Sequence, residues 1–366
     1  MSEPSLSPEL REALFSLHRE LCVLDSSHGQ EHLVASFLES YLTKKGYVVQ
    51  RQLVHAPSSE NPHPRENIFA HMPANSNPRL LLCSHMDVVK PYIPFSDKGD
   101  WVYGRGTADA KASVACQIIA AELVMKMGIR AEDVGFLYTV DEESGFTGIN
   151  KANELDIRPD FIIVGEPTEN KLAIGHKGVY GFYVDITGVP SHSGYPEQGK
   201  SAIKALASII DALQSTQWPI DKHFGPTVIN IARVNGGIAP NIVPAKAWLE
   251  VSMRISVPMS EIRPLVERVL QSVPLEGGVK TELTIRKAPL WDPVPCDVVE
   301  GFETMVAGFF TDLPFFAPGG HIPKRYLIGP GSILVAHGEG ECISREEMAE
   351  AVGLYVKLIR QLLAEK

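Results

Sequence analysis

Two histidines and several carboxylates stand just after apolar stretches of the chain, as expected of a metal-binding or acid–base site. His85 ends the stretch LLLCSH, and Asp87 follows two residues later. Asp109 lies in YGRGTADAK, a glycine-rich turn that enters a helical pattern. Imidazole nitrogens and carboxylate oxygens are ligands for divalent cations such as zinc. Further candidates follow apolar runs: Glu142 and Glu143 after GFLYTV, Glu166 after FIIVG, and His337 after SILVA.

These residues lie far apart in the chain, so they form one site only if a sheet brings them together. In the first 170 residues, apolar strand patterns with little alternation are separated by helical patterns, which is typical of an α/β sheet covered on both faces. Loops beyond the carboxyl ends of such strands converge on one crevice. The expected elements are helices over 8–22, within 26–47 and over 108–128, and strands over 48–54, 66–72, 79–85, 135–140 and 160–166.

From about Gly175 the pattern changes to strand, helix, strand, strand, helix, strand, which is typical of a ferredoxin-like sandwich. These elements are expected over 178–189, 201–214, 227–237, 245–256, 260–273 and 280–287. The earlier pattern resumes with a strand pattern within 325–340 and a helix over 345–366. The sequence therefore predicts one domain made of residues 1–174 and 294–366, with a second domain inserted at 175–293.

Composition and charge exclude several classes of protein. With 44% hydrophobic and 21% charged residues, the chain is expected to fold. A net charge of -10 argues against nucleic-acid or anionic-membrane partners. We find no signal-peptide pattern and no run long enough to span a bilayer, so we expect a cytoplasmic protein. The five cysteines are scattered and form no CxxC pair, so we expect reduced thiols.

Each candidate also has an ordinary structural explanation. A histidine after a strand is usually a hydrogen-bonded structural residue, and adjacent glutamates in a loop are usually solvated. Asp87 either forms a turn by bonding its own backbone or orients the imidazole of His85 and raises its basicity. Because so many ligand-type residues follow strand patterns, we favour the metal site and the orienting role of Asp87.

The motifs SHMDVV, GRGTADAKAS, DEESG, GEPTEN, PSHSGYP and GPGSILVAH occur in this order and resemble those of a zinc exopeptidase family, peptidase family M20. This family contains aminoacylases, acetylornithine deacetylases, succinyl-diaminopimelate desuccinylases and glutamate carboxypeptidases. The resemblance runs from SSHGQE to His337, and GEPTEN with GHKG looks closest to the deacetylase and desuccinylase branch and to fungal carboxypeptidases. It implies a catalytic domain with a mixed, largely parallel sheet and an inserted ferredoxin-like lid and dimerisation domain.

The same resemblance implies two Zn²⁺ ions, for which Co²⁺ can substitute, bridged by Asp109. His85 and Glu166 would complete one metal site, and Glu143 and His337 the other. Two such ions polarise a carbonyl and lower the pKa of the water between them.

Glu142 would be the general base, which takes a proton from this water and later gives it to the departing nitrogen. Since consecutive residues of an extended segment point apart, Glu142 is expected to face the water while Glu143 faces the metal.

A second group of candidates lies in the inserted domain and rests on the same resemblance. His192 in PSHSGYP matches a histidine that, in dimeric relatives, reaches the active site of the other subunit and steadies the oxyanion. Asn241 in GGIAPNIVP and Arg254 in VSMRIS match positions that hold the substrate carboxylate, a task for which the planar fork of arginine is suited. A salt bridge along the strand face is the alternative for Arg254.

Two positions depart from the family pattern. Ala112 replaces the usual glycine after the lysine of DAKAS, a change that the start of a helix tolerates. Phe310 stands where relatives commonly have glycine before Thr311, in a segment that often touches the substrate, so it bears on specificity. His321, in the same loop, is either a substrate contact or, as we favour, a solvated loop residue.

The resemblance implies a homodimeric, dinuclear zinc hydrolase that cleaves the amide bond of an N-acyl amino acid or a short peptide with a free carboxylate. A ureido or carbamoyl-amide hydrolase on the same scaffold is an alternative. A noncatalytic binding protein that kept the fold is disfavoured, because such a protein is expected to lose ligands or the base, and all of these positions are filled here.

Overall fold

The structure is a computed structural model that describes residues 6–59, 61–285 and 290–364. The chain forms two compact units. The first contains Met1–Ile174, Cys296–Met305 and Thr311–Lys366, and the second contains Gly175–Pro295 and Val306–Phe310. The second unit therefore takes in a short segment, 306–310, that the sequence analysis assigns to the last part of the chain.

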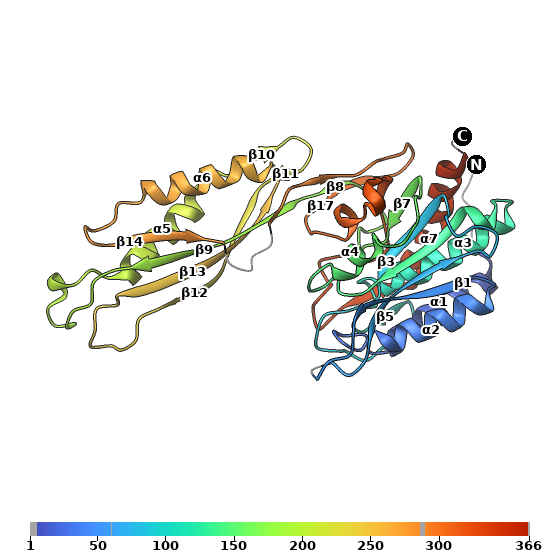
Figure 1. Ribbon diagram of the computed structural model, residues 1–366, viewed down its shortest axis with the longest axis horizontal. Helices are drawn as coiled ribbons and strands as arrows, with labels where there is room; N and C mark the ends of the chain where they lie inside the picture. Colours follow the sequence, from blue (N-terminus) through green and yellow to red (C-terminus); the bar gives the residue numbers. More distant parts are fainter. Residues whose placement is uncertain (1–5, 60, 286–289, 365–366) are drawn as a thin grey trace. The chain divides into compact units, whose positions relative to one another are not determined.

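A six-stranded mixed sheet forms the centre of the first unit (Figure 1). Its strand order is β1-β2-β6-β3-β7-β18. The pairs from β6 to β18 are parallel, and the pairs that β2 forms with β1 and β6 are antiparallel. Every residue of β3, β6 and β7 is buried, as expected for strands covered on both faces. The strands are β1 (Val48–His55), β2 (Arg65–His71), β3 (Leu80–His85), β6 (Val134–Thr139), β7 (Phe161–Val164) and β18 (Lys324–Leu327).

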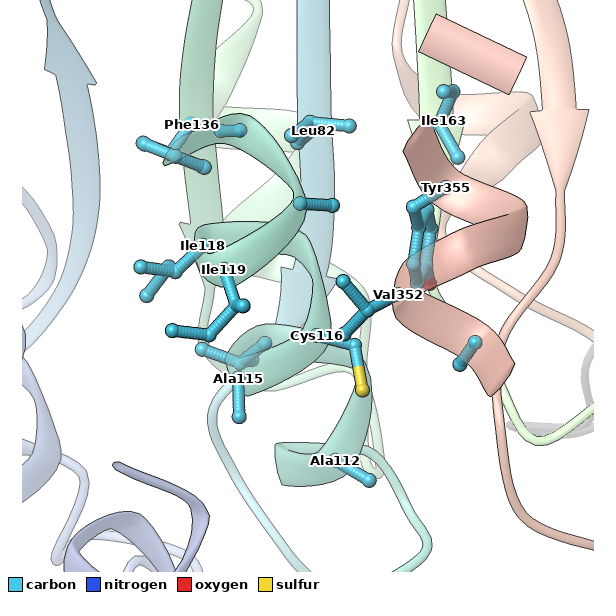
Figure 2. Close-up of a cluster of buried hydrophobic side chains, with 14 of the residues drawn as sticks. Leu82, Ala112, Ala115, Cys116, Ile118, Ile119, Phe136, Ile163, Val352 and Tyr355 are labelled. Atoms are coloured by element: carbon cyan, nitrogen blue, oxygen red, sulfur yellow. The ribbon is translucent and has the colours of Figure 1, made fainter. Parts of the chain in front are cut away.

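The helices of the first unit pack with this sheet in one hydrophobic core. Helix α3 is buried along most of its length, and Figure 2 shows its residue Cys116 beside Val352 of α7, with Ile118 and Ile119 on the side of α3 away from α7. This packing fixes the N-terminal end of α3, which begins two residues after Asp109. The helices are α1 (Pro8–Val23), α2 (His32–Lys44), α3 (Lys111–Lys126), α4 (Thr147–Ala152) and α7 (Arg345–Ala364).

Local sequence explains where these helices begin and end. The side chain of Ser7 accepts a hydrogen bond from the backbone N–H of Leu10 and so caps α1. Gly46 and Gly128 follow α2 and α3 with φ of 91° and 95°, a left-handed conformation that glycine adopts without strain. Both helices end within the ranges expected from the sequence.

The second unit is a ferredoxin-like α+β sandwich, so the predicted fold class is confirmed for both parts of the chain. Its strands have the order β12-β13-β9-β14, with β15 also paired to β9. Alternate residues of β13 from Ala247 to Ile255 are buried in its core. The elements are β9 (Gly178–Thr187), α5 (Ala202–Ser215), β12 (Val228–Gly236), β13 (Lys246–Ile255), α6 (Met259–Ser272), β14 (Lys280–Thr284) and β15 (Leu290–Trp291).

The remaining elements are short. Strands β19, β5 and β4 form a small sheet in that order. The boundaries between the two units at 174/175 and 305/306 fall within β8 and β17. Residues 286–287 of the predicted strand 280–287, and 365–366 of the predicted last helix, lie outside the described residues. The short strands are β4 (Ser96–Lys98), β5 (Trp101–Tyr103), β8 (Leu172–His176), β10 (Ile220–Asp221), β11 (Gly225–Pro226), β16 (Val294–Pro295), β17 (Thr304–Ala307) and β19 (Cys342–Ser344). The 3₁₀ turns are η1 (Ala131–Asp133), η2 (Pro196–Gln198), η3 (Leu313–Phe315) and η4 (Pro318–Gly320).

Among the described helices, none combines the length and the apolar character needed to cross a bilayer.

Candidate metal centre

His85 is the last residue of β3, and its imidazole is buried. Its Nδ1 lies 2.9 Å from the backbone carbonyl oxygen of Asp87, which can only accept a hydrogen bond. Nδ1 therefore carries a proton that it donates to this carbonyl, which leaves Nε2 as the ring nitrogen that can bind a cation. That nitrogen lies 3.0 Å from Asp109 Oδ1 and 3.9 Å from Glu166 Oε1. Glu166 itself comes shortly after the end of β7.

Asp109 lies between two groups of ligand-type atoms. Its carboxylate has Oδ1 beside His85 and Oδ2 at 3.3 Å from His337 Nε2. The same imidazole nitrogen lies 3.0 Å from Glu143 Oε2. The structure thus forms two triads, His85–Asp109–Glu166 and Asp109–Glu143–His337, each with ligand atoms within 4.8 Å of one another. Asp109 is common to both triads.

The charges of this cluster fit a pair of divalent cations. Glu166 Oε1 is buried and has no hydrogen-bond partner among the described residues. Burial raises the pKa of Glu166 well above its ordinary value, and the charge of Asp109 adds to the rise although His85 opposes it. Burial and the charge of Asp109 likewise raise the pKa of Glu143. The carboxylates therefore repel one another, and a cation between them would remove this repulsion.

The second triad is less enclosed than the first. The side chain of His337 is 51% exposed, whereas that of His85 is 1% exposed. Hydrogen bonds to the carboxylates of Asp109 and Glu143 raise the pKa of His337 to about 10. Any bound cation would displace that proton from the imidazole.

The expectation that His337 ends a strand is wrong. Residues 333–337 form turns, and the apolar side chain of Leu334 is 86% exposed. The last strand of the sheet is β18, which ends at Leu327, so a longer loop carries His337 to the triad. His337 has a φ of 63°, a left-handed backbone conformation that is uncommon for a residue other than glycine.

The expected extended geometry of Glu142 and Glu143 is also wrong. Both residues belong to a turn after β6, which begins with Asp141 at a φ of 68°. Glu143 enters the second triad, while the buried side chain of Glu142 belongs to neither triad. Burial, reinforced by the charge of Glu166, raises the pKa of Glu142 well above its ordinary value.

Asp87 does not orient His85 through its carboxylate as we expected. The carboxylate Oδ1 lies 3.8 Å from His85 Nδ1, and the backbone carbonyl of Asp87 accepts the imidazole proton instead. The two carboxylate oxygens accept the backbone N–H groups of Glu142 and Glu143, each at 3.2 Å. Asp87 therefore connects both halves of the site, by its backbone to His85 and by its side chain to the glutamate turn.

Several residues that support the triads were missed in the sequence. Asp312 is buried and accepts a hydrogen bond of 2.7 Å from Thr139, which is the register partner of His85 in β6. Burial raises the pKa of Asp312 to about 7. Arg105 and Glu341 form a buried ion pair whose hydrogen bonds reach the backbone of the triad loops. No spacing rule links such partners, because 236 residues separate Arg105 from Glu341.

The other candidates lie in the second unit. His192 is exposed and accepts a hydrogen bond of 3.0 Å from the backbone N–H of Gly194. The adjacent Ser193 donates its backbone N–H to the carbonyl of Asn241, so these two loops lie side by side. Arg254 is on β13, and its exposed side chain forms no salt bridge among the described residues. The strand-face salt bridge considered for Arg254 is therefore not found there.

The two unexplained residues of the 310–321 segment have packing partners. Phe310 stacks on Trp291 with ring centroids 4.7 Å apart, and it makes a T-shaped contact with His176 with ring centroids 4.6 Å apart. These are contacts within the second unit. In the first unit, His321 Nε2 donates to the backbone carbonyl of Pro159 at 2.7 Å, so this histidine is tied to the protein rather than fully solvated.

Comparisons with known proteins identify the family. Residues 174–273 match the peptidase dimerisation domain of the M20 family. The chain is 38% identical, over 98% of its length and 87% of the other chain, to a peptidase M20 domain-containing protein of Schizosaccharomyces pombe. It is also 38% identical to a probable carboxypeptidase of Aspergillus niger, over 94% of this chain and 88% of that one.

A crystal structure has the same fold. A tripeptidase from Staphylococcus aureus superposes with a TM-score of 0.76 at 23% identity, over 96% of this chain and 99% of that one. The resemblance found in the sequence is thereby confirmed. With 38% identity to an M20 protein over nearly its whole length, the chain belongs to the M20 family of peptidases.

Proposed function

We propose that the chain is a dinuclear zinc hydrolase that cleaves the amide bond of an N-acyl amino acid or a short peptide with a free carboxylate. The observation that carries this proposal is the pair of triads that share Asp109. Membership of a peptidase family supports hydrolysis of a linear amide bond. The relative named a probable carboxypeptidase supports a substrate with a free carboxylate.

Each residue of the centre has a distinct task in this proposal. His85 and Glu166 would hold one zinc ion, Glu143 and His337 would hold the other, and Asp109 would bind both. When bound, the two ions would supply Lewis-acid chemistry, which polarises a carbonyl and lowers the pKa of water.

Glu142 is the proton carrier in this proposal. Burial and the charge of Glu166 raise its pKa, which favours a carboxylate that takes up a proton and holds it until the leaving nitrogen needs it. The hydrogen bonds from the turn to Asp87 hold the backbone of Glu142 and Glu143 in place, so the base keeps its position beside a metal ligand.

The second unit would contribute substrate recognition. We assign the substrate carboxylate to Asn241 and Arg254, and stabilisation of the oxyanion to His192 of the other subunit in a homodimer. The match of residues 174–273 to a dimerisation domain supports the homodimer. We place the enzyme in the cytoplasm, which is consistent with its five free cysteines.

Metal removal with a substrate panel tests this function. Chelation is expected to abolish hydrolysis, and zinc or cobalt is expected to restore it, because the proposed reaction requires the Lewis acid to polarise the carbonyl. The panel contains acetyl, succinyl, dipeptide and ureido compounds, and cleavage of an N-acyl amino acid or dipeptide is expected. Full activity in a preparation shown to be metal-free would contradict the proposal, and cleavage of the ureido compound alone would favour the carbamoyl-amide alternative.

Substitution of Glu142 tests the proton carrier. Glu142→Gln keeps the size of the side chain but cannot accept the proton, so kcat is expected to fall by about 10²- to 10⁴-fold. Metal content should stay at the wild-type value, because Glu142 belongs to neither triad. Elemental analysis and steady-state kinetics on the same sample measure both quantities. Wild-type kcat in a fully loaded Glu142→Gln protein would exclude this role.

Mixing two inactive variants tests whether His192 acts across subunits. His192→Ala retains its triads, and Asp109→Asn retains its His192, so a hybrid dimer has one complete site. Random mixing is expected to restore up to about a quarter of wild-type activity, since half of the dimers are hybrids with one working site of two. Subunit exchange is verified with differently tagged chains. No recovery after proven exchange would rule out the crossed arrangement.

A further inference from the structure

Arg105 and Glu341 form an ion pair that is almost fully enclosed in the first unit. Arg105 Nη1 donates to Glu341 Oε2 at 2.7 Å, and the two side chains are 2% and 0% exposed. Removing both charges from water is expensive, so a buried pair of this kind is weak evidence for added stability. The remaining hydrogen bonds of the pair indicate what it does.

Glu341 binds the backbone that carries the shared ligand. Its Oε1 accepts the N–H of Ala108 at 3.1 Å and the N–H of Asp109 at 3.2 Å. These groups lie just before α3, where the chain must present the Asp109 carboxylate to both triads. Because hydrogen bonds from N–H groups to a carboxylate are strong, the peptide at Asp109 is held in one orientation.

Arg105 binds the backbone that carries His337. Its Nη2 donates to the carbonyl of His337 at 3.2 Å, and Nη1 donates to the carbonyl of Gly338, also at 3.2 Å. Its Nε donates to the carbonyl of Pro91 at 3.3 Å. A planar guanidinium can serve these acceptors and Glu341 together, which the single ammonium of a lysine cannot do in the same geometry.

The pairing of β19 with β5 in the small sheet brings Arg105 and Glu341 close together. Cys342 of β19 pairs with Tyr103 of β5, and the backbone N–H of Gly104 donates to the carbonyl of Glu341 at 3.0 Å. Glu341 thus precedes one strand while Arg105 follows the other. The pair is anchored in regular structure, whereas His337 is on a partly exposed loop of turns.

We propose that the Arg105–Glu341 pair is a positioning device for the Asp109–Glu143–His337 triad. It joins the loop of Asp109 to the loop of His337 through their backbones and, being neutral as a pair, adds no net charge to the centre. The His85–Asp109–Glu166 triad depends on it less, because Asp109 is the one member of that triad that the pair contacts. His85 ends β3 and Glu166 comes two residues after β7, and both side chains are buried. This inference rests on the proposed role of both triads as metal ligands.

Stepwise metal binding tests the proposal. The metal-free protein is titrated with Co²⁺ against a competing chelator, and visible absorbance reports the two binding steps. His337→Ala identifies the step that belongs to its triad. Arg105→Lys keeps the positive charge but loses the planar guanidinium. In this variant the dissociation constant of the His337 step is expected to rise about ten- to hundredfold. The other step is expected to change far less.

Two further variants make the result specific. Glu341→Gln keeps an acceptor for the two N–H groups but loses the charge that binds Arg105, and it should weaken the same step. Arg11→Lys is the matched control, because the guanidinium of Arg11 also forms an ion pair with a glutamate, Glu346, but at the protein surface. This control should bind both ions as the wild type does.

The possible outcomes distinguish failure of the positioning role of the Arg105–Glu341 pair from failure of the proposed dinuclear function. Unchanged binding at both steps in Arg105→Lys and Glu341→Gln would overturn the positioning role. Equal weakening of both steps, or loss of the fold in thermal unfolding, would also overturn it, since the pair would then be a general stabiliser. A wild-type protein that binds no metal would instead reject the dinuclear function itself.

Discussion

The mutual repulsion of buried carboxylates is the constraint on which the centre depends. Asp109, Glu143 and Glu166 converge with two imidazoles in a largely buried volume, and Glu142 adds a fourth carboxyl group nearby. Burial raises the pKa values of all three glutamates. Such a cluster needs something that compensates its charge, and a pair of divalent cations would do so with the donor atoms that are present.

The surrounding architecture keeps these groups in place before any cation binds. The buried strand β3 fixes His85, and the backbone carbonyl of Asp87 fixes its tautomer. The buried helix α3 fixes the position of Asp109 from the other side. His337 comes from a partly exposed loop, and the backbone of this loop accepts hydrogen bonds from Arg105. The first triad is therefore enclosed by buried elements, and the second triad would depend on the ion pair.

Sequence reasoning predicted much of this arrangement because its strongest patterns are local. Apolar strand patterns and helical spacing predicted the folds of both units. His85 lies at the end of β3, as the strand predicted over 79–85 indicated. The turn at Glu142 was not predicted, because it depends on the left-handed backbone of Asp141 and on N–H bonds to Asp87, 55 residues away. The stretch before His337 is apolar enough to resemble a strand, yet among the described residues its pairing is limited to one isolated bridge between Ser332 and Thr168, and residues 333–337 form turns.

The central claim is that two metal ions share Asp109, and anomalous X-ray scattering at the zinc edge from crystals of protein purified without chelators tests it most directly. The account predicts two zinc peaks, one bonded to His85 and Glu166 and one to Glu143 and His337, with Asp109 bonded to both. A zinc-loaded crystal with no peak at these residues, or with one peak that Asp109 does not contact, would contradict it.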